Sequence, residues 1–371
     1  MNMKSNWLKL NSNSEPKLIF SPSVPRISAS THEALMHAQI FHRSETFHQL
    51  IDETSEMLLS ILGCGNYTTI LAAGSGTLAN DIMLANFSVG TRCPLVLVNG
   101  EFGQRLLHQC SRYRSDTLVF DAGWGKRFDL VLLETYLKKK HEIDTIFFVA
   151  VETSVGMVNP VKKICELARR LGKQVGIDAI SALGAVPIDY TSEAISCITG
   201  SSGKALLSIP GVLILFIRPK NFNTISGSIP HVLDLRSLLA ARKSPGGVRN
   251  TLTSVLVYAL HNAVADILNE GLSKCYRRGS LLKTHLLEQM KAISINPLAN
   301  SDCPMVTSFE RPNSIEWEKI RDYLKQRNLA VYDNSSYLEK RNIFQVATFG
   351  DYSLNEIFYL TNTLKDFLQS T

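Results

Sequence analysis

The chain has 371 residues, of which 45% are hydrophobic and 19% are charged, as in ordinary globular proteins. The net charge of +6 is spread without a dense basic block, which argues against nucleic-acid binding. The N-terminus lacks the apolar core of a signal peptide, and no apolar run is long enough to span a membrane. The seven cysteines show no metal-type spacing, so we expect reduced thiols, no metal site and a location in the cytoplasm.

The chain begins with a polar segment, residues 1–17, which we predict to be an N-terminal arm. Residues 18–28 contain two prolines, which favour an extended or turning backbone. Apolar residues then recur with helical spacing over residues 46–62. We therefore predict the first long helix there.

Between about residues 68 and 218, short apolar runs alternate with longer amphipathic stretches. The predicted strands are 68–74, 94–100, 116–122, 144–152, 174–180, 197–203 and 211–217, and the predicted helices between them are 78–87, 102–113, 130–140 and 161–171. This alternation predicts an α/β fold with a mostly parallel sheet and helices on both faces. Ligands of such sheets gather at the carboxyl ends of the strands.

The last third of the chain predicts a different arrangement. Residues 226–250 are expected to be irregular, and a long helical pattern over 253–293 is interrupted near Gly271. Predicted strands at 306–311, 329–334 and 344–349 and a final helix at 354–368 describe a small α+β domain. We divide the chain into a large domain, residues 18–272, and a small domain, residues 273–371.

The first predicted strand is followed by Gly74, Ser75, Gly76 and Thr77, directly before a predicted helix. Glycines let the backbone approach an anion, hydroxyls donate hydrogen bonds, and a helix N-terminus offers free amides. This turn therefore suits a phosphate group. The same residues also suit ordinary helix capping.

Other predicted strands end at residues whose side chains are suited to contact a ligand. Phe102 can pack in the core or stack on a planar ring, and the hydroxyls of Thr153 and Ser154 can bond a phenolic oxygen. Asp178 ends an apolar strand, where a carboxylate needs a cationic partner. That partner is either a structural arginine or a protonated ring nitrogen.

Lys204 lies among small residues, shortly before the apolar run 211–217. It is either a solvated loop cation or a buried amine, and burial favours the neutral amine that condenses with a carbonyl. In chain order, these residues match a phosphate, a ring face, a ring oxygen, a ring nitrogen and an aldehyde. Pyridoxal phosphate carries all five features.

The segments 42–47, 74–81, 99–105, 152–160, 178–189 and 202–211 together resemble the class V aminotransferases, a family of fold type I pyridoxal-phosphate enzymes. The resemblance is closest to the branch of the alanine–glyoxylate, serine–glyoxylate and 2-aminoethylphosphonate–pyruvate aminotransferases. It implies a homodimer whose active sites lie at the subunit interface. It also implies an amino donor and an oxo-acid acceptor as substrates.

The resemblance also assigns roles to single residues. Lys204 forms the internal aldimine, and the residues that contact the cofactor are Ser75, Gly76 and Thr77 at the phosphate, Phe102 and Ile180 on the two ring faces, Thr153 or Ser154 at the ring oxygen, and Asp178 at the ring nitrogen. Thr251 lies where the family reaches the neighbouring subunit's phosphate. It is equally suited to cap a helix.

One departure concerns the substrate. The family usually places a carboxylate-binding arginine where this chain has Gln345, and an uncharged amide loses the charge assistance of that contact. Arg43, Arg249, Arg26 and Arg341 are candidates to replace it, although each also suits a surface position. We therefore expect Gln345, Arg43 and Arg249 at the substrate.

We predict an aminotransferase that moves an amino group between a small amino compound and a small 2-oxo acid of the pyruvate or glyoxylate type. The loss of the carboxylate arginine leaves an alternative, a pyridoxal-phosphate-dependent lyase, decarboxylase or cyclising enzyme. A second alternative is a non-catalytic protein that keeps the fold and the cofactor. Asp178 and Lys204 argue against the second alternative, since a scaffold alone needs neither residue.

Overall fold

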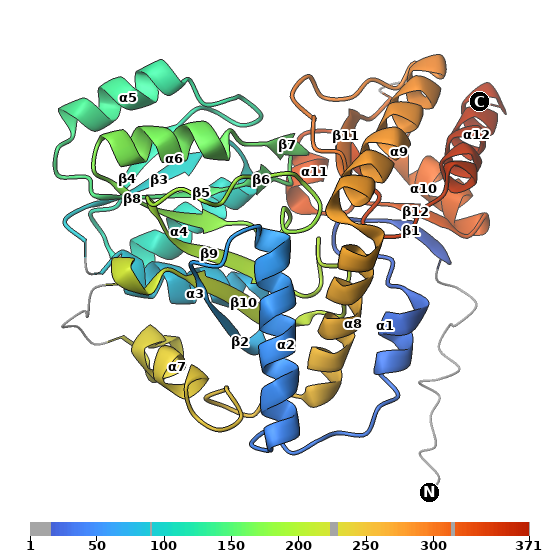
Figure 1. Ribbon diagram of the computed structural model, residues 1–371. Helices are drawn as coiled ribbons and strands as arrows, with labels where there is room; N and C mark the ends of the chain where they lie inside the picture. Colours follow the sequence, from blue (N-terminus) through green and yellow to red (C-terminus); the bar gives the residue numbers. More distant parts are fainter. Residues whose placement is uncertain (1–15, 90, 223–228, 313–315, 371) are drawn as a thin grey trace, which may run out of the picture.

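The computed structural model describes residues 16–89, 91–222, 229–312 and 316–370 of the chain (Figure 1). Of the predicted N-terminal arm, residues 1–15 lie outside the described residues. A seven-stranded sheet forms the centre of the larger part of the molecule. Its strand order is β2 (Thr68–Gly74), β10 (Gly211–Ile217), β9 (Ile195–Ser201), β8 (Gln174–Asp178), β5 (Thr145–Val149), β3 (Pro94–Val98) and β4 (Leu118–Asp121).

The sheet is mostly parallel, as the alternation of strands and helices predicted. Only β10 runs against its neighbours β2 and β9, while the other four pairings are parallel. Successive side chains of a strand point to opposite faces of the sheet. In β5, Ile146 and Phe148 join one hydrophobic core, whereas Phe147 and Val149 join the other. The continuous apolar strands are therefore buried on both faces.

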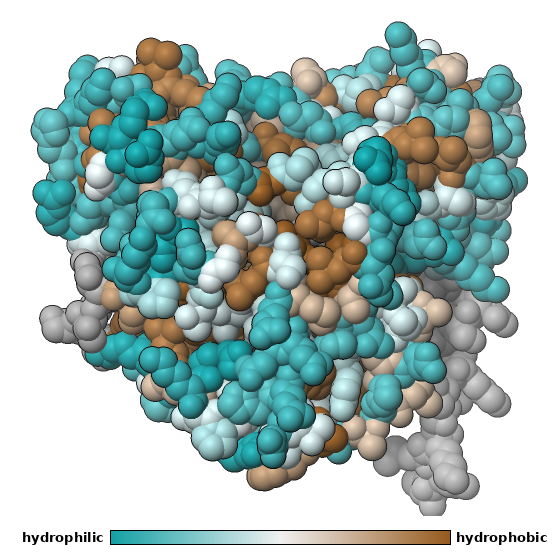
Figure 2. Space-filling model, viewed as in Figure 1, coloured by the Kyte–Doolittle hydropathy of each residue, from teal (hydrophilic) through white to brown (hydrophobic). Residues whose placement is uncertain are grey.

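Helices cover both faces of this sheet (Figure 1). The core that contains Phe147 also takes residues from α3 (Gly76–Phe87) and α4 (Glu101–Tyr113). The core that contains Phe148 takes residues from α2 (Glu45–Leu62), α5 (Leu130–Lys139), α6 (Val161–Arg170) and α8 (Ser254–Glu270). The exposed face of α2 is largely hydrophilic, as Figure 2 shows, because α2 is amphipathic.

The C-terminal part has its own core. It is built from α9 (Leu272–Ala292), β11 (Val306–Glu310), α10 (Trp317–Gln326), β12 (Leu329–Val331), β13 (Ile343–Ala347) and α12 (Leu354–Ser370), with α11 (Ser336–Lys340) beside it. The predicted long helix is interrupted at Gly271, whose φ of 85° favours glycine. The limits that we set at 272 and 273 coincide with this break and stay a prediction.

The N-terminal strand β1 (Leu18–Phe20) lies outside the large sheet. It pairs in parallel with β12, and Phe20 is fully buried in the C-terminal core. The predicted large domain, residues 18–272, includes this strand, although the strand packs with the C-terminal part. No sequence pattern shows which distant strand β1 pairs with. The next residues return toward the large sheet, so the N-terminal segment connects the two parts of the molecule.

The prediction that residues 226–250 are irregular was wrong in part. Their described portion contains α7 (Leu235–Arg242), whose first turn is capped by Asp234 through a 3.1 Å hydrogen bond from the Arg236 amide. Leu235 and Leu238 are buried against the large sheet. Eight residues give too short a pattern to predict a helix that depends on this packing.

Several other short elements were not predicted. They are α1 (Ala29–Ala34), β7 (Met157–Val158), α10 and α11, whereas the predicted strand 144–152 is divided into β5 and β6 (Val151–Glu152). Within the described ranges, no helix is both long and apolar enough to pass through a membrane.

Candidate active site

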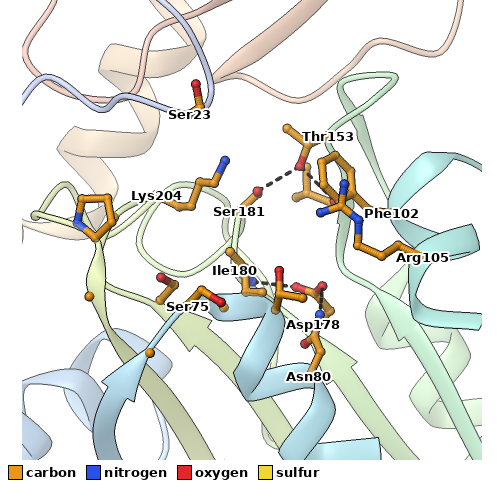
Figure 3. A pocket seen from close by; sticks show the side chains of 18 residues that line it. Ser23, Ser75, Asn80, Phe102, Arg105, Thr153, Asp178, Ile180, Ser181 and Lys204 are labelled. Carbon is orange, nitrogen blue, oxygen red and sulfur yellow. Dashed lines mark hydrogen bonds between the residues drawn. The ribbon is translucent and has the colours of Figure 1, made fainter. Parts of the chain in front are cut away.

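A cavity of about 500 Å³ lies at the carboxyl ends of the large sheet (Figure 3). Its walls include the turn between β2 and α3, the end of β8 and the loop that follows β9. Lys204 and Asp178 both line it, and Figure 3 shows them on opposite sides of the same space. The sequence separates these residues, but the parallel strands bring their ends together.

The turn before α3 provides a helix N-terminus at the cavity. Ser75 is the N-cap residue, and its hydroxyl oxygen accepts a 3.3 Å hydrogen bond from the Leu78 amide. Gly76 is in contact with Ile180, because a β-carbon at residue 76 would come within 2.5 Å of the Ile180 Cδ1 atom. Capping therefore accounts for part of the motif, and the dipole at this helix end still favours an anion.

Asp178 is held by two hydrogen bonds. Its Oδ1 atom accepts from the Ile180 amide at 3.0 Å, and its Oδ2 atom accepts from Asn80 Nδ2 at 2.7 Å. Burial raises the pKa of this carboxyl, whereas the two hydrogen bonds and the charges of Arg105 and Lys204 lower it. A buried carboxylate of this kind is suited to receive a further cationic donor.

Lys204 is partly buried in the loop after β9, where its ammonium group donates a 2.9 Å hydrogen bond to the Pro22 carbonyl. Burial, and after it the charge of Arg105, lower its pKa to about 8, while the charge of Asp178 acts in the opposite direction. A lysine with a depressed pKa has more neutral amine at physiological pH. Such an amine is suited to attack a carbonyl group.

The aromatic side of the cavity is formed by the first turn of α4. Phe102 lines the cavity, and the guanidinium of Arg105 lies 4.8 Å from the centre of its ring. The buried carboxylate of Glu152 accepts hydrogen bonds from the amides of Phe102 and Gly103 at 3.3 and 3.0 Å. Glu152 thereby fixes the start of α4 and the position of the aromatic ring.

The structure distinguishes the two hydroxyl residues that follow Glu152. Thr153 lines the cavity and donates a 2.9 Å hydrogen bond to the Ser181 hydroxyl. Ser154 is fully buried, donates to Glu152 at 2.5 Å and accepts from the Glu101 amide at 3.0 Å. Thr153 is therefore the one that faces the proposed cofactor space, and Ser154 supports the start of α4.

Gln345 has a position that its predicted substrate role does not fit. It is fully buried in β13, and its Nε2 atom donates to the Thr153 carbonyl at 2.7 Å and to the Ser308 hydroxyl at 2.8 Å. It does not line the cavity. Because a carbonyl can only accept, the amide group must turn its nitrogen toward Thr153. Gln345 thus connects the C-terminal part to the backbone beside the cavity.

The other predicted arginines also lie away from the cavity of this chain. Arg249 donates to the backbone carbonyl of His231, Arg26 pairs with Glu356, and Arg341 lies over the Trp124 ring at 4.4 Å. Arg43 is exposed just before α2.

Thr251 is exposed before α8, outside the cavity of this chain. The N-cap residue of α8 is Thr253, so helix capping does not explain Thr251. A contact between Thr251 and a neighbouring subunit stays a prediction.

Sequence reasoning gave no site role to five polar residues that line the cavity: Ser23, Asn80, Arg105, Ser181 and Ser201. Two of them had a usable signal. Asn80 is four residues after Gly76 and Arg105 is three residues after Phe102, and such spacings place side chains on one face of a helix. Ser23 comes from the N-terminal segment, whose return to the cavity no local pattern indicates.

The cavity residues fit pyridoxal phosphate. A helix N-terminus with Ser75 suits its phosphate, Phe102 and Ile180 offer ring faces, and Asp178 offers a buried carboxylate to its ring nitrogen. Lys204 has an amine of depressed pKa, which suits its aldehyde. The fold and the cavity therefore define an enzyme of the pyridoxal-phosphate type.

Comparison with known proteins identifies the family. The model of the family described as aminotransferase class-V matches residues 27–335. The chain belongs to this family and is a pyridoxal-phosphate-dependent aminotransferase, which confirms the predicted fold class, enzyme class and cofactor.

Individual relatives agree with this assignment. A 2-aminoethylphosphonate–pyruvate transaminase of Bacillus cereus strain Q1 is 26% identical over 304 residues, which cover 80% of this chain and 83% of the relative. The solved structure of an alanine–glyoxylate aminotransferase from Nostoc sp. has a TM-score of 0.87 at 23% identity, covering 99% and 100% of the two chains. A ureidoglycine–glyoxylate aminotransferase from Bacillus subtilis gives 0.85 at 22% identity, covering 95% and 92%. The two solved structures support the fold.

Proposed function

We propose that this aminotransferase moves an amino group from a small amino compound to a small 2-oxo acid of the pyruvate or glyoxylate type. The observation that carries the proposal is the shared cavity of Lys204 and Asp178, beside the N-terminus of α3. The names of the relatives support the acceptor class, since each names pyruvate or glyoxylate.

We assign the cofactor contacts residue by residue. Ser75, Gly76 and Thr77 hold the phosphate at the N-terminus of α3, Phe102 and Ile180 cover the two ring faces, Thr153 contacts the ring oxygen, and Asp178 pairs with the ring nitrogen. All seven line the cavity, which supports the assignment. Ser154 acts indirectly, because it is bonded to Glu152 and not directed into the cavity.

Lys204 is the proposed catalytic residue. Bound pyridoxal phosphate supplies an aldehyde to take up the amino group and a protonated ring that withdraws electrons from the substrate's α-carbon. Lys204 Nζ holds the cofactor and, once released by the donor, takes the proton from that α-carbon as a general base. Its depressed pKa supports this role, because a base must be unprotonated to accept a proton.

Arg105 is our candidate for the anionic group of the substrate. It lines the cavity, its guanidinium lies over the Phe102 ring, and no carboxylate of the described residues forms an ion pair with it. Gln345 has its amide hydrogens directed to Thr153 and Ser308. We therefore place the carboxylate contact at Arg105, on α4, in place of β13.

We further propose a homodimer in which Arg43, Arg249 and Thr251 act at the cavity of the neighbouring subunit. The segment before α2 supports an interface, because Met36 and Phe41 are large apolar residues with exposed fractions of 86% and 65%. Sedimentation of the purified protein tests this part. All seven cysteines are free, which supports a reducing location, and we propose the cytoplasm.

The deciding experiment follows one half of the reaction. Purified holoenzyme mixed with a panel of small amino compounds should convert its cofactor stoichiometrically to pyridoxamine phosphate, and pyruvate or glyoxylate should reverse the conversion. Borohydride reduction should fix a cofactor-sized mass on the peptide that contains Lys204. Release of carbon dioxide or of a cleaved product, without pyridoxamine phosphate, would instead identify a decarboxylase or a lyase.

A further inference from the structure

A chain of two buried hydrogen bonds lies behind Asp178. The Thr199 hydroxyl donates to Asn80 Oδ1 at 2.6 Å, and Asn80 Nδ2 donates to Asp178 Oδ2 at 2.7 Å. The exposed fractions of Asn80, Thr199 and Asp178 are 4%, 0% and 9%. The three residues come from α3, β9 and β8, so only the packing of these elements creates the chain (Figure 3 shows Asn80 beneath Asp178).

The direction of these bonds is fixed by chemistry. An ionised carboxylate only accepts, so Asn80 must turn its amide nitrogen toward Asp178. This leaves the Asn80 oxygen facing Thr199, whose hydroxyl has one hydrogen to donate. Thr199 also lies 3.5 Å from the Ile177 carbonyl, a much longer contact than the one to Asn80. Thr199 thereby orients the amide, and the amide orients the carboxylate.

Asp178 needs such donors because burial favours its neutral form. Among the described residues, Asn80 is the one side chain that donates a hydrogen bond to it, and the Ile180 amide is the backbone donor. The charged or titratable groups that face it are Arg105 on α4, Lys204 after β9 and Tyr190 after β8. The two cations act through space, so the direct contacts set the carboxylate's direction.

Core packing alone does not require this polar pair. The other residues of α3 that face the sheet include Ala79 and Met83, which join an apolar core. An apolar side chain of similar size could therefore occupy position 80. Placing an amide and a hydroxyl there costs desolvation, which their hydrogen bonds offset.

We propose that Asn80, oriented by Thr199, is a positioning residue that holds the Asp178 carboxylate ionised and aimed at the cofactor's ring nitrogen. The inference rests on the proposed role of Asp178. Asn80 does not touch the reacting atoms and acts through Asp178. Substitution of Asn80 should therefore weaken the binding of ligands that carry the ring nitrogen, and should have little effect on the binding of ligands that lack it.

The test compares two ligands on the apoenzyme, pyridoxal phosphate and its 1-deaza analogue, in which carbon replaces the ring nitrogen. Equilibrium dialysis gives the dissociation constant of each ligand. For Asn80→Leu, we expect the affinity for pyridoxal phosphate to fall about 10- to 100-fold and that for the analogue to change less than about 3-fold. Thr199→Val, which is nearly isosteric, should shift the ratio in the same direction by a smaller factor.

Asn86→Leu is the matched control. Asn86 is also a buried asparagine of α3, but its amide donates to the Ile82 and Leu233 carbonyls, away from the cavity. This variant should leave the ratio of the two affinities unchanged. If Asn80→Leu does not fold, Thr199→Val decides the question.

Two results would overturn the proposal. One is equal weakening of both ligands in the Asn80 and Thr199 variants, which indicates a merely structural role, and the other is wild-type affinity for both. A wild-type apoenzyme that binds no pyridoxal phosphate would refute the proposed function itself. That failure is distinguishable, because it appears before any substitution is made.

Discussion

The carboxyl edge of the large sheet and the small sheet of β11 and β13 differ in what they present to the active site. The large sheet directs Asp178, Lys204 and the α3 N-terminus into one cavity. In the small sheet, Gln345 is fully buried and bonded to backbone and a neighbouring hydroxyl. In the proposed function, the cofactor contacts therefore lie at the ends of parallel strands, and the substrate's charge is recognised outside β13.

This difference indicates at which positions the amino acid can vary without loss of the fold or of the cofactor site. The strand ends of the large sheet are fixed by its hydrogen-bonded register, in which Asp178 pairs with both Val149 and Thr199. A change there would disturb the cofactor directly. The fold does not need the family's usual arginine at position 345, because the glutamine there forms hydrogen bonds within the protein.

The largest expected effect comes from removing the cavity amine. Lys204→Ala should lower the rate of the half-reaction by at least about 10³-fold, because both covalent attachment and the general base are lost. Rapid-mixing spectroscopy of single turnovers measures this rate. Lys220→Ala, which removes an exposed lysine paired with Glu193, is the control and should be unaffected. A Lys204→Ala enzyme with near-normal turnover would contradict the assignment.

The same lysine should leave a signature in the stability of the apoenzyme. Its folded-state pKa of about 8 lies below its ordinary value of 10.5, so between these pH values the unfolded chain binds more protons. The free energy of unfolding should therefore rise with pH across this window, by up to about 3 kcal/mol. Urea unfolding of the wild type and Lys204→Met, compared at pH 7.5 and 10.5, isolates the contribution. Equal pH slopes would show that Lys204 is solvated.

Substitution of Arg105, on α4, tests whether the substrate's charge is recognised outside β13. Arg105→Ala should raise the KM for the oxo acid about 10- to 100-fold with little change in kcat, since a charge-assisted hydrogen bond contributes about 1.5–3 kcal/mol. Arg105→Lys should recover part of the loss, because it keeps the charge but not the planar fork. Steady-state kinetics over a range of acceptor concentrations measure both. An unchanged KM would contradict this role of Arg105. It would indicate that a residue of the neighbouring subunit binds the substrate's anionic group.

The smallest effect on substrate binding is expected at Gln345. Gln345→Ala should change the KM for the oxo acid less than about 2-fold, because its side chain does not line the cavity. It should lower the free energy of unfolding by about 1–3 kcal/mol, since the Thr153 carbonyl and Ser308 hydroxyl lose a donor. Denaturant unfolding and steady-state kinetics measure the two quantities. A KM effect as large as that of Arg105→Ala would remove the contrast between the two sheets.

The sequence was sufficient for the main elements of the fold. Apolar periodicity located the strands of the large sheet and most of its helices, because each pattern is local and the central strands are buried on both faces. It did not locate α7, whose pattern is short, or α10. It also could not place β1, since strand pairing between residues 18 and 329 leaves no mark on either segment.

For the site, the sequence determined which residue types stand at the strand ends, including Ser75, Asp178 and Lys204. Tertiary structure alone decided where their neighbours point. Asn80 meets Asp178 across 98 residues of chain, and Gln345 meets Thr153 across 192. The reason is physical: a sequence pattern specifies the face of an element, whereas the partner of a buried polar group depends on how whole elements pack.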